Sequence, residues 1–167
     1  GAVNIVDLRD RNRIDMTSEV KQWSFNPNDI QQRDTLSLNF VSPVRIKTNG
    51  AYGNDFSAQE FLNVDWRRAN TLASLYGQQE NSKIPYYPST KLTVEQRYLR
   101  WIDLNRWSSR QQQKMKLGGL VGTLTLKGEL TGSDLSILQF AETFHLGKNT
   151  GFGLGKITME GEGLVDD

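Results

Sequence analysis

The order of helical and strand-like segments is the feature that most constrains the fold of this chain. Two segments repeat their apolar residues at helical spacing, and four others alternate apolar with polar residues as half-buried strands do. In chain order they are a strand at 35–47, a helix at 57–77, strands at 97–107 and 118–130, a helix at 134–146 and a strand at 156–164. Strand, helix, strand, strand, helix, strand is the order of the ferredoxin-like fold, the split βαβ arrangement.

Local signals mark the boundaries of these segments. Ser57 and Glu60 stand at capping-box spacing before the first helix. For the second helix we expect Ser133 as the N-cap and Gly147 as the stop. Pro43 has no N–H for a sheet ladder, so the first strand is expected at a sheet edge or with a bulge at this residue.

We therefore predict an α+β domain with a four-stranded antiparallel sheet and two helices on one face, as in RNA-recognition modules. Residues 77–96 form a long polar connection, and residues 1–34 form an extension with one additional strand. The start at Gly1 indicates an excised fragment. The first helix is expected to bury one face, made of Phe61, Leu62, Ala69, Leu72, Ala73 and Tyr76.

Composition excludes several classes of protein. With 37% hydrophobic and 23% charged residues in 167, the chain is typical of one globular domain. It has no cysteine, which excludes disulfides and thiolate metal sites. Without a signal-like start or an apolar run of membrane length, a cytoplasmic location without membrane contact is expected.

Charge is distributed unevenly although the net charge is only +1. Residues 97–116 hold six bases and a single acid, Asp103. A basic block of this kind suits a polyanion, and an ordinary solvated polar face explains it about as well.

A glycine-rich loop at 147–155 follows the second helix and contains Lys148. It does not match the phosphate-binding loop of nucleotide hydrolases, because Thr150 and Ile157 replace the required glycine and hydroxyl residues. It also leads from a helix into a strand, whereas a dinucleotide site needs phosphate at a helix N-terminus. An ATP or NAD site is therefore not expected.

Two uses of the loop remain open. Its glycines can arrange backbone N–H groups into a nest for phosphate and admit a nucleic-acid strand at close range. Alternatively, Gly147 ends the helix and Gly151, Gly153 and Gly155 only permit an irregular strand entry.

Three stretches, in order, resemble the CRISPR-associated endoribonucleases that cut repeat RNA into guide RNAs (the Cas6 family of the RAMP superfamily). They are "LNFVSPVRIK", "DLNRWSSRQQQKMKLGGLVGTLTL" and "FHLGKNTGFGLGKI". The resemblance implies two ferredoxin-like domains in the intact protein, of which 35–167 is the second and 1–34 the lead-in from a missing N-terminal domain. It also implies cleavage without metal or cofactor, in which the ribose 2′-OH attacks the adjacent phosphate.

The resemblance suggests which residues contact the RNA. His145, which precedes the loop, is a candidate catalyst, although its ring packing under the loop against a carbonyl is the alternative. If strands 97–107 and 118–130 pair as a hairpin, basic residues near its tip would follow RNA phosphates. The expected RNA contacts are Arg45, Arg106, Arg110, Lys114, Lys116, Gly147, Lys148, Gly151, Gly153, Gly155 and Lys156.

The expected partners are CRISPR repeat RNA or guide RNA, and other Cas proteins. The leading hypothesis is the RNA-binding domain of a repeat-cleaving endoribonuclease. The alternative is a non-catalytic RAMP subunit that scaffolds guide RNA in an interference complex, because such subunits also carry glycine-rich loops. A domain that binds only proteins has the acidic tail, and nothing else, in its favour.

Overall fold

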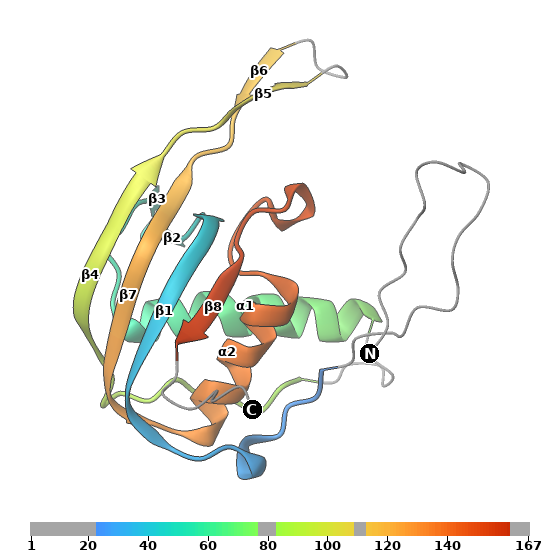
Figure 1. Cartoon of the computed structure of the whole chain (residues 1–167). Helices are drawn as coiled ribbons and strands as arrows, with labels where there is room; N and C mark the ends of the chain where they lie inside the picture. Colours follow the sequence, from blue (N-terminus) through green and yellow to red (C-terminus); the bar gives the residue numbers. More distant parts are fainter. Residues whose placement is uncertain (1–22, 77–82, 109–112, 161–167) are drawn as a thin grey trace, which may run out of the picture.

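A computed structural model describes residues 23–76, 83–108 and 113–160 (Figure 1). The first half contains β1 (Arg33–Val44), β2 (Lys47–Thr48), β3 (Ala51–Tyr52) and α1 (Ala58–Tyr76), after a short 3-10 turn, η1 (Pro27–Asp29). The second half contains β4 (Thr93–Ile102), β5 (Asn105–Ser108), β6 (Gln113–Lys116), β7 (Gly119–Leu130), α2 (Gly132–Phe144), η2 (Thr150–Phe152) and β8 (Ile157–Glu160).

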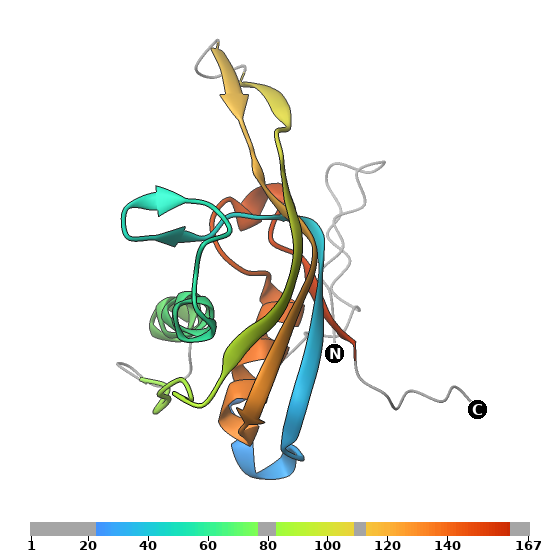
Figure 2. The ribbon, with the colours of Figure 1, turned by 90° about the vertical axis from the view of Figure 1, so that its left-hand side faces the viewer.

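Four strands form the main sheet in the order β4-β7-β1-β8, with antiparallel neighbours throughout. Both helices cover the same face of this sheet, as the edge-on view in Figure 2 shows. The other face carries the polar side chains of Ser37, Asn39, Thr123 and Thr125, which hydrogen-bond across β1 and β7. The predicted α+β, ferredoxin-like architecture is confirmed.

β1 is a central strand, so of the two readings of Pro43 the edge position is wrong and the bulge is correct. Its pairing with β7 shifts register between Phe40 and Val44, around the proline that cannot donate. β1 is followed directly by the hairpin of β2 and β3. That short hairpin was not predicted.

Two other expectations need correction. Helix α2 is capped by Thr131 rather than Ser133: the Thr131 hydroxyl accepts from the N–H of Asp134, whose carboxylate accepts from the N–H of Thr131. The strand expected at 97–107 begins earlier, at Thr93, and ends at Ile102. The additional strand expected near the N-terminus lies outside the described residues.

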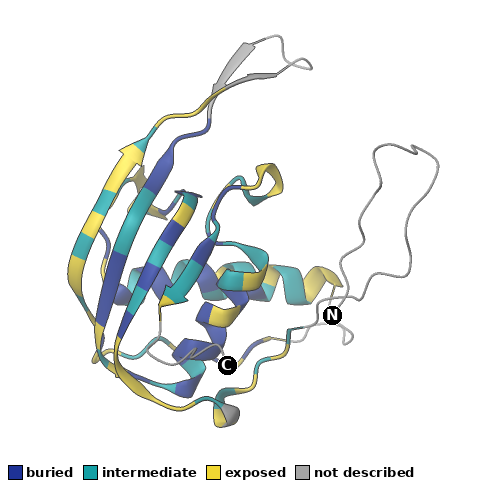
Figure 3. Cartoon of the chain, viewed as in Figure 1, coloured by how far each residue is buried: buried dark blue, intermediate teal, exposed yellow. Residues whose placement is uncertain are grey.

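The core lies between the helices and the inner face of the sheet, where Figure 3 shows the buried residues. Phe40 of β1 stacks on Phe61 of α1 with ring centroids 5.9 Å apart. Phe61, Leu62 and Ala69 are buried as predicted, whereas Tyr76 is 81% exposed because it ends α1 beyond the sheet. No helix in the described part of the chain is long and apolar enough to cross a membrane.

Candidate nucleic-acid interface

Two glycines of the glycine-rich loop are required by the fold itself. Gly147 has φ 80° and forms a bridge with Arg45, just after β1, so that a Cβ there would come within 2.5 Å of the Arg45 carbonyl oxygen. Gly155 has φ 82°, and its Cβ would lie 2.1 Å from the Leu146 carbonyl oxygen. Both positions combine a left-handed backbone with a close backbone approach, which only glycine permits.

Ser42 anchors the other side of the loop to the bulge of β1. Its hydroxyl donates to the Gly153 carbonyl oxygen (3.0 Å) and accepts from the N–H of Lys156 (2.9 Å). The N–H of Gly155 donates to the Pro43 carbonyl oxygen at 3.0 Å. The bulge and the loop are thus built as one unit.

The backbone donors of the loop mostly have acceptors inside the protein. The N–H of Lys148 donates to Arg45, and those of Phe152 and Gly153 donate within the loop. With the N–H groups of Gly155 and Lys156 also engaged, these five donors do not form an open nest for phosphate. Of the two uses left open for the loop, a phosphate nest is thus not available at these five positions.

The tip of the loop is different. Gly151 has no atom within 4 Å of an added Cβ, and its φ lies outside the left-handed range. The protein's own packing gives no reason for a glycine there. An exposed position without a Cβ permits a second molecule to approach the backbone closely.

Five cations line a hollow of about 500 Å³ between the β2–β3 hairpin, α1 and the glycine-rich loop. We call this the basic hollow; its cations are Arg45, Lys47, Arg67, Arg68 and Lys148. Among the described residues, the lining includes no aspartate or glutamate. Such a one-sided set of charges in a concavity attracts anions.

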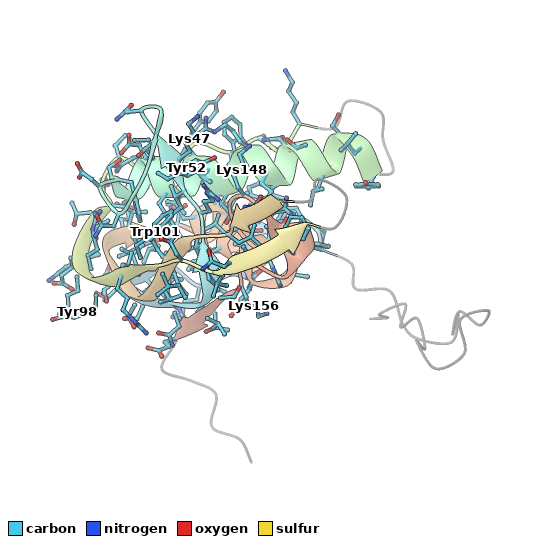
Figure 4. The ribbon with its side chains drawn as sticks, turned by 90° about the horizontal axis from the view of Figure 1, so that it is seen from above. Lys47, Tyr52, Tyr98, Trp101, Lys148 and Lys156 are labelled. Carbon is cyan, nitrogen blue, oxygen red and sulfur yellow. The ribbon has the colours of Figure 1, made fainter. Side chains whose placement is uncertain are left out.

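Three of these cations, Lys47, Arg67 and Lys148, are exposed. Figure 4 shows Lys47 and Lys148 close together beside α1. The Nε of Arg67 donates a hydrogen bond to the carbonyl oxygen of Asn63 at 3.1 Å, one turn earlier in the same helix. These three side chains supply the accessible charge of the basic hollow.

Arg68 has a structural task. Its Nε donates to the His145 carbonyl oxygen at 2.8 Å, and its Nη2 donates to that of Phe144 at 2.9 Å. It thereby satisfies the carbonyls at the end of α2 and joins the two helices. Burial lowers the pKa of Arg68, and the nearby charge of Asp65 opposes that shift.

Asp65 is fully buried on α1, and neither of its carboxylate oxygens has a hydrogen-bond partner. Burial raises the pKa of this carboxyl well above its usual range, while the charge of Arg68 acts in the opposite direction. A carboxyl in such surroundings favours its protonated form.

His145 follows α2 with φ 65° and is half-buried. Its Nδ1 lies 2.9 Å from the Leu154 carbonyl oxygen, an acceptor only, so Nδ1 carries the proton. This is the arrangement of the structural alternative, with the ring under the loop. The imidazole therefore ties the end of α2 to the returning arm of the loop.

Lys156 lies apart from Lys47 and Lys148, as Figure 4 shows. Its ammonium group donates to the Glu142 carbonyl oxygen near the end of α2, at 2.9 Å. Of the lysines of the loop region, Lys148 lines the basic hollow and Lys156 does not. Sequence reasoning grouped the two, and the structure separates them.

The basic block lies mainly on a second hairpin. β4 and β7 pair as predicted, and β5 and β6 extend that pair beyond the helices (Figure 1). Arg106 lies on β5, and Lys114 and Lys116 lie on β6. Arg110 falls outside the described residues.

Sequence reasoning missed three cations of the basic hollow, Lys47, Arg67 and Arg68. A signal for the arginines was present, because they form an adjacent pair within a helix whose apolar face was recognised. The pair predicts positive charge on α1 outside its apolar face. The position of these arginines beside the loop depends on how α1 crosses the sheet.

The sequence profile of the family "CRISPR-associated endoribonuclease Cas6" matches residues 38–157. The chain belongs to the Cas6 family. The match contains all three stretches on which the resemblance was based. It confirms that resemblance.

Solved Cas6 structures share the fold. A Cas6 product complex aligns with a TM-score of 0.52 at 22% identity over 80% of this chain and 55% of that one. A Thermus thermophilus Cas6 aligns with a TM-score of 0.55 at 17% identity, over 79% of this chain and 55% of that one. A chain of a partial Cas6-RT-Cas1–Cas2 complex aligns with a TM-score of 0.53 at 20% identity, over 76% of this chain and 22% of that one.

This chain thus spans about half the length of the first two Cas6 structures, each covered to 55%. Identities this low establish the fold alone. The comparison with curated proteins gives no match.

Proposed function

We propose that this chain is the RNA-holding C-terminal half of a Cas6 endoribonuclease that processes CRISPR repeat RNA. The basic hollow carries the proposal: five cations gather beside the glycine-rich loop, with no acid among the described residues that line it. Residues 35–167 would be the second ferredoxin-like domain, and 1–34 the lead-in from the first. The length of the matched structures supports this division.

In the proposed reaction the ribose 2′-oxygen attacks the adjacent phosphorus and the P–O5′ bond breaks, leaving a 2′,3′-cyclic phosphate and a 5′-OH. A base removes the 2′ proton and an acid supplies a proton to the 5′ oxygen, so no metal ion is required. Lys47, Arg67 and Lys148 would hold backbone phosphates in the basic hollow. His145 would position the loop through Leu154.

The glycine-rich loop would contribute by its shape. Gly147 and Gly155 fix its two arms, while Gly151 leaves an open approach at the tip. Because the backbone donors of the arms are already engaged, phosphate binding would depend on the side chains of the basic hollow. Partner Cas proteins are a further proposal, supported by the match to a Cas6-RT-Cas1–Cas2 complex.

The test measures binding of the full-length protein to its repeat RNA over a range of salt concentrations. Lys148→Ala and Arg67→Ala should each weaken binding to all RNAs alike and reduce the slope of log K against log salt by about 0.7–0.9 per lost phosphate contact. Lys91→Ala is the matched control, because Lys91 is exposed and pairs with Glu129 away from the basic hollow. Equal effects of all three substitutions would contradict the proposed site.

Cleavage is tested separately by incubating the full-length protein with repeat RNA in EDTA. Defined products ending in a cyclic phosphate are expected. RNA that is bound but stays intact would indicate the alternative, a scaffolding subunit.

A further inference from the structure

A tyrosine on the β2–β3 hairpin lies next to two cations. Tyr52 is 40% exposed, and the guanidinium carbon of Arg45 lies 4.3 Å from the centre of its ring. The ammonium nitrogen of Lys47 lies 5.7 Å from the same point. Lys47 and Tyr52 are register partners across the hairpin, which puts their side chains on the same side.

The same two cations line the basic hollow. Arg45 and Lys47 therefore contact the tyrosine ring and also border the space assigned to phosphate. Figure 4 shows Tyr52 beside Lys47, with Lys148 of the glycine-rich loop next to them. An aromatic surface and a cationic concavity are thus adjacent and share residues.

A second cation–π pair in the chain shows what a purely structural pair looks like. Arg97 lies over Phe56 at 4.7 Å, its Nη2 donates to the Phe56 carbonyl oxygen at 2.7 Å, and the phenyl ring is buried. The ring of that pair belongs to the core. The Arg45–Tyr52 pair differs, because Tyr52 is 40% exposed and lies on the short β2–β3 hairpin.

Unpaired bases of RNA stack on aromatic rings and on guanidinium planes, whereas bases inside a duplex already stack on their neighbours. A planar stack beside the cationic concavity therefore fits one unpaired nucleotide. We propose that Arg45 and Tyr52 form a stacking subsite for a single unpaired base, whose backbone phosphate lies in the basic hollow.

This inference rests on the proposed function and adds that the RNA at this site is single-stranded. The hydroxyl of Tyr52 has no role in stacking, and the ring supplies the interaction. Tyr52→Phe should therefore bind RNA like the wild type, while Tyr52→Ala should lose the binding energy that stacking of one base contributes.

The experiment uses the full-length protein and an eight-nucleotide single-stranded RNA, together with eight versions that each carry one abasic position. Tyr52→Ala should weaken binding of the intact RNA about 5- to 150-fold. In the wild type one abasic position should cause a similar loss, and Tyr52→Ala should be insensitive to that position. Tyr98→Ala is the control, because Tyr98 is 71% exposed on β4 and lies apart from Tyr52 (Figure 4).

Each outcome has one meaning. If Tyr52→Ala weakens intact and abasic RNAs equally, the ring merely holds the two cations and the stacking subsite is wrong, while the proposed function stands. If Tyr52→Ala binds like the wild type, the subsite is also wrong. If the wild type binds RNA without salt dependence or not at all, both the proposed function and this inference fail.

Discussion

Gly155 offers a sharp test of the argument that the fold requires the arms of the loop. We consider Gly155→Ala. An alanine there would place a left-handed backbone, φ 82°, on an L-residue and set its Cβ 2.1 Å from the Leu146 carbonyl oxygen. The left-handed conformation alone costs about 1–2 kcal/mol.

The contact with Leu146 adds to this cost because the two backbones must move apart. That movement breaks the bond from the Leu146 N–H to the Gly155 carbonyl oxygen (2.8 Å) and the bond from the Gly155 N–H to Pro43 (3.0 Å). Each is worth about 0.5–1.5 kcal/mol. The free energy of unfolding should therefore fall by about 2–5 kcal/mol.

Thermal unfolding followed by circular dichroism measures this loss. For a domain of this size about 1 kcal/mol corresponds to about 2–4 °C, so the melting temperature should fall by about 4–20 °C. Gly151→Ala is the matched control and should change stability by less than about 0.5 kcal/mol, because nothing lies within 4 Å of the added Cβ. Equal melting temperatures for the two variants would refute the reasoning.

Two further predictions concern groups at the helices. Burial raises the pKa of Asp65 above its unfolded value near 3.8, so the native state binds more protons than the unfolded state and stability declines as pH rises above that value. Urea unfolding at pH 4 and pH 7 should therefore show Asp65→Asn gaining stability relative to the wild type at the higher pH; an equal difference at both pH values would show that Asp65 ionises freely. His145→Ala in the full-length protein should slow RNA cleavage only modestly, because the ring bonds to Leu154; a loss of about 10²–10⁴-fold with RNA affinity retained would establish acid–base catalysis instead.

The sheet and the helices were predictable because their signals are local. Alternation of Leu36, Leu38 and Phe40 with polar neighbours identifies the face of β1 that packs on the helices. The cap of α2 was also within reach: Thr131 and Asp134 have capping-box spacing, which Ser133 lacks. The prediction of Ser133 was wrong because it considered the capping residue alone and not the acidic partner three residues later.

The start of β4 was harder to predict. Glu95 and Gln96 are exposed on an edge strand, where polar residues on both faces remove the alternation that identifies a strand. The structure also adds a second set of charges, the basic hollow, to the predicted basic block, whose contacts with RNA stay a prediction. Sequence proximity does not report which cations share a concavity.

The basic hollow itself was beyond local reasoning. It joins Lys47, Arg67 and Lys148, which are far apart in the sequence and come from a hairpin, a helix and a loop. Their proximity depends on how these three elements pack together in the fold. Of the predicted contacts, Arg45, Gly147 and Lys148 line the hollow; their role toward RNA stays a prediction.

The arms of the glycine-rich loop are anchored to the rest of the protein independently of the residues at its tip. Ser42 and Gly155 hold the arms, whereas Thr150–Phe152 at the tip includes no buried residue. The residues of the tip can therefore be replaced without disturbing the hydrophobic core. If the loop contacts RNA as proposed, a few surface residues at its tip could change the RNA preference while the folding stays the same.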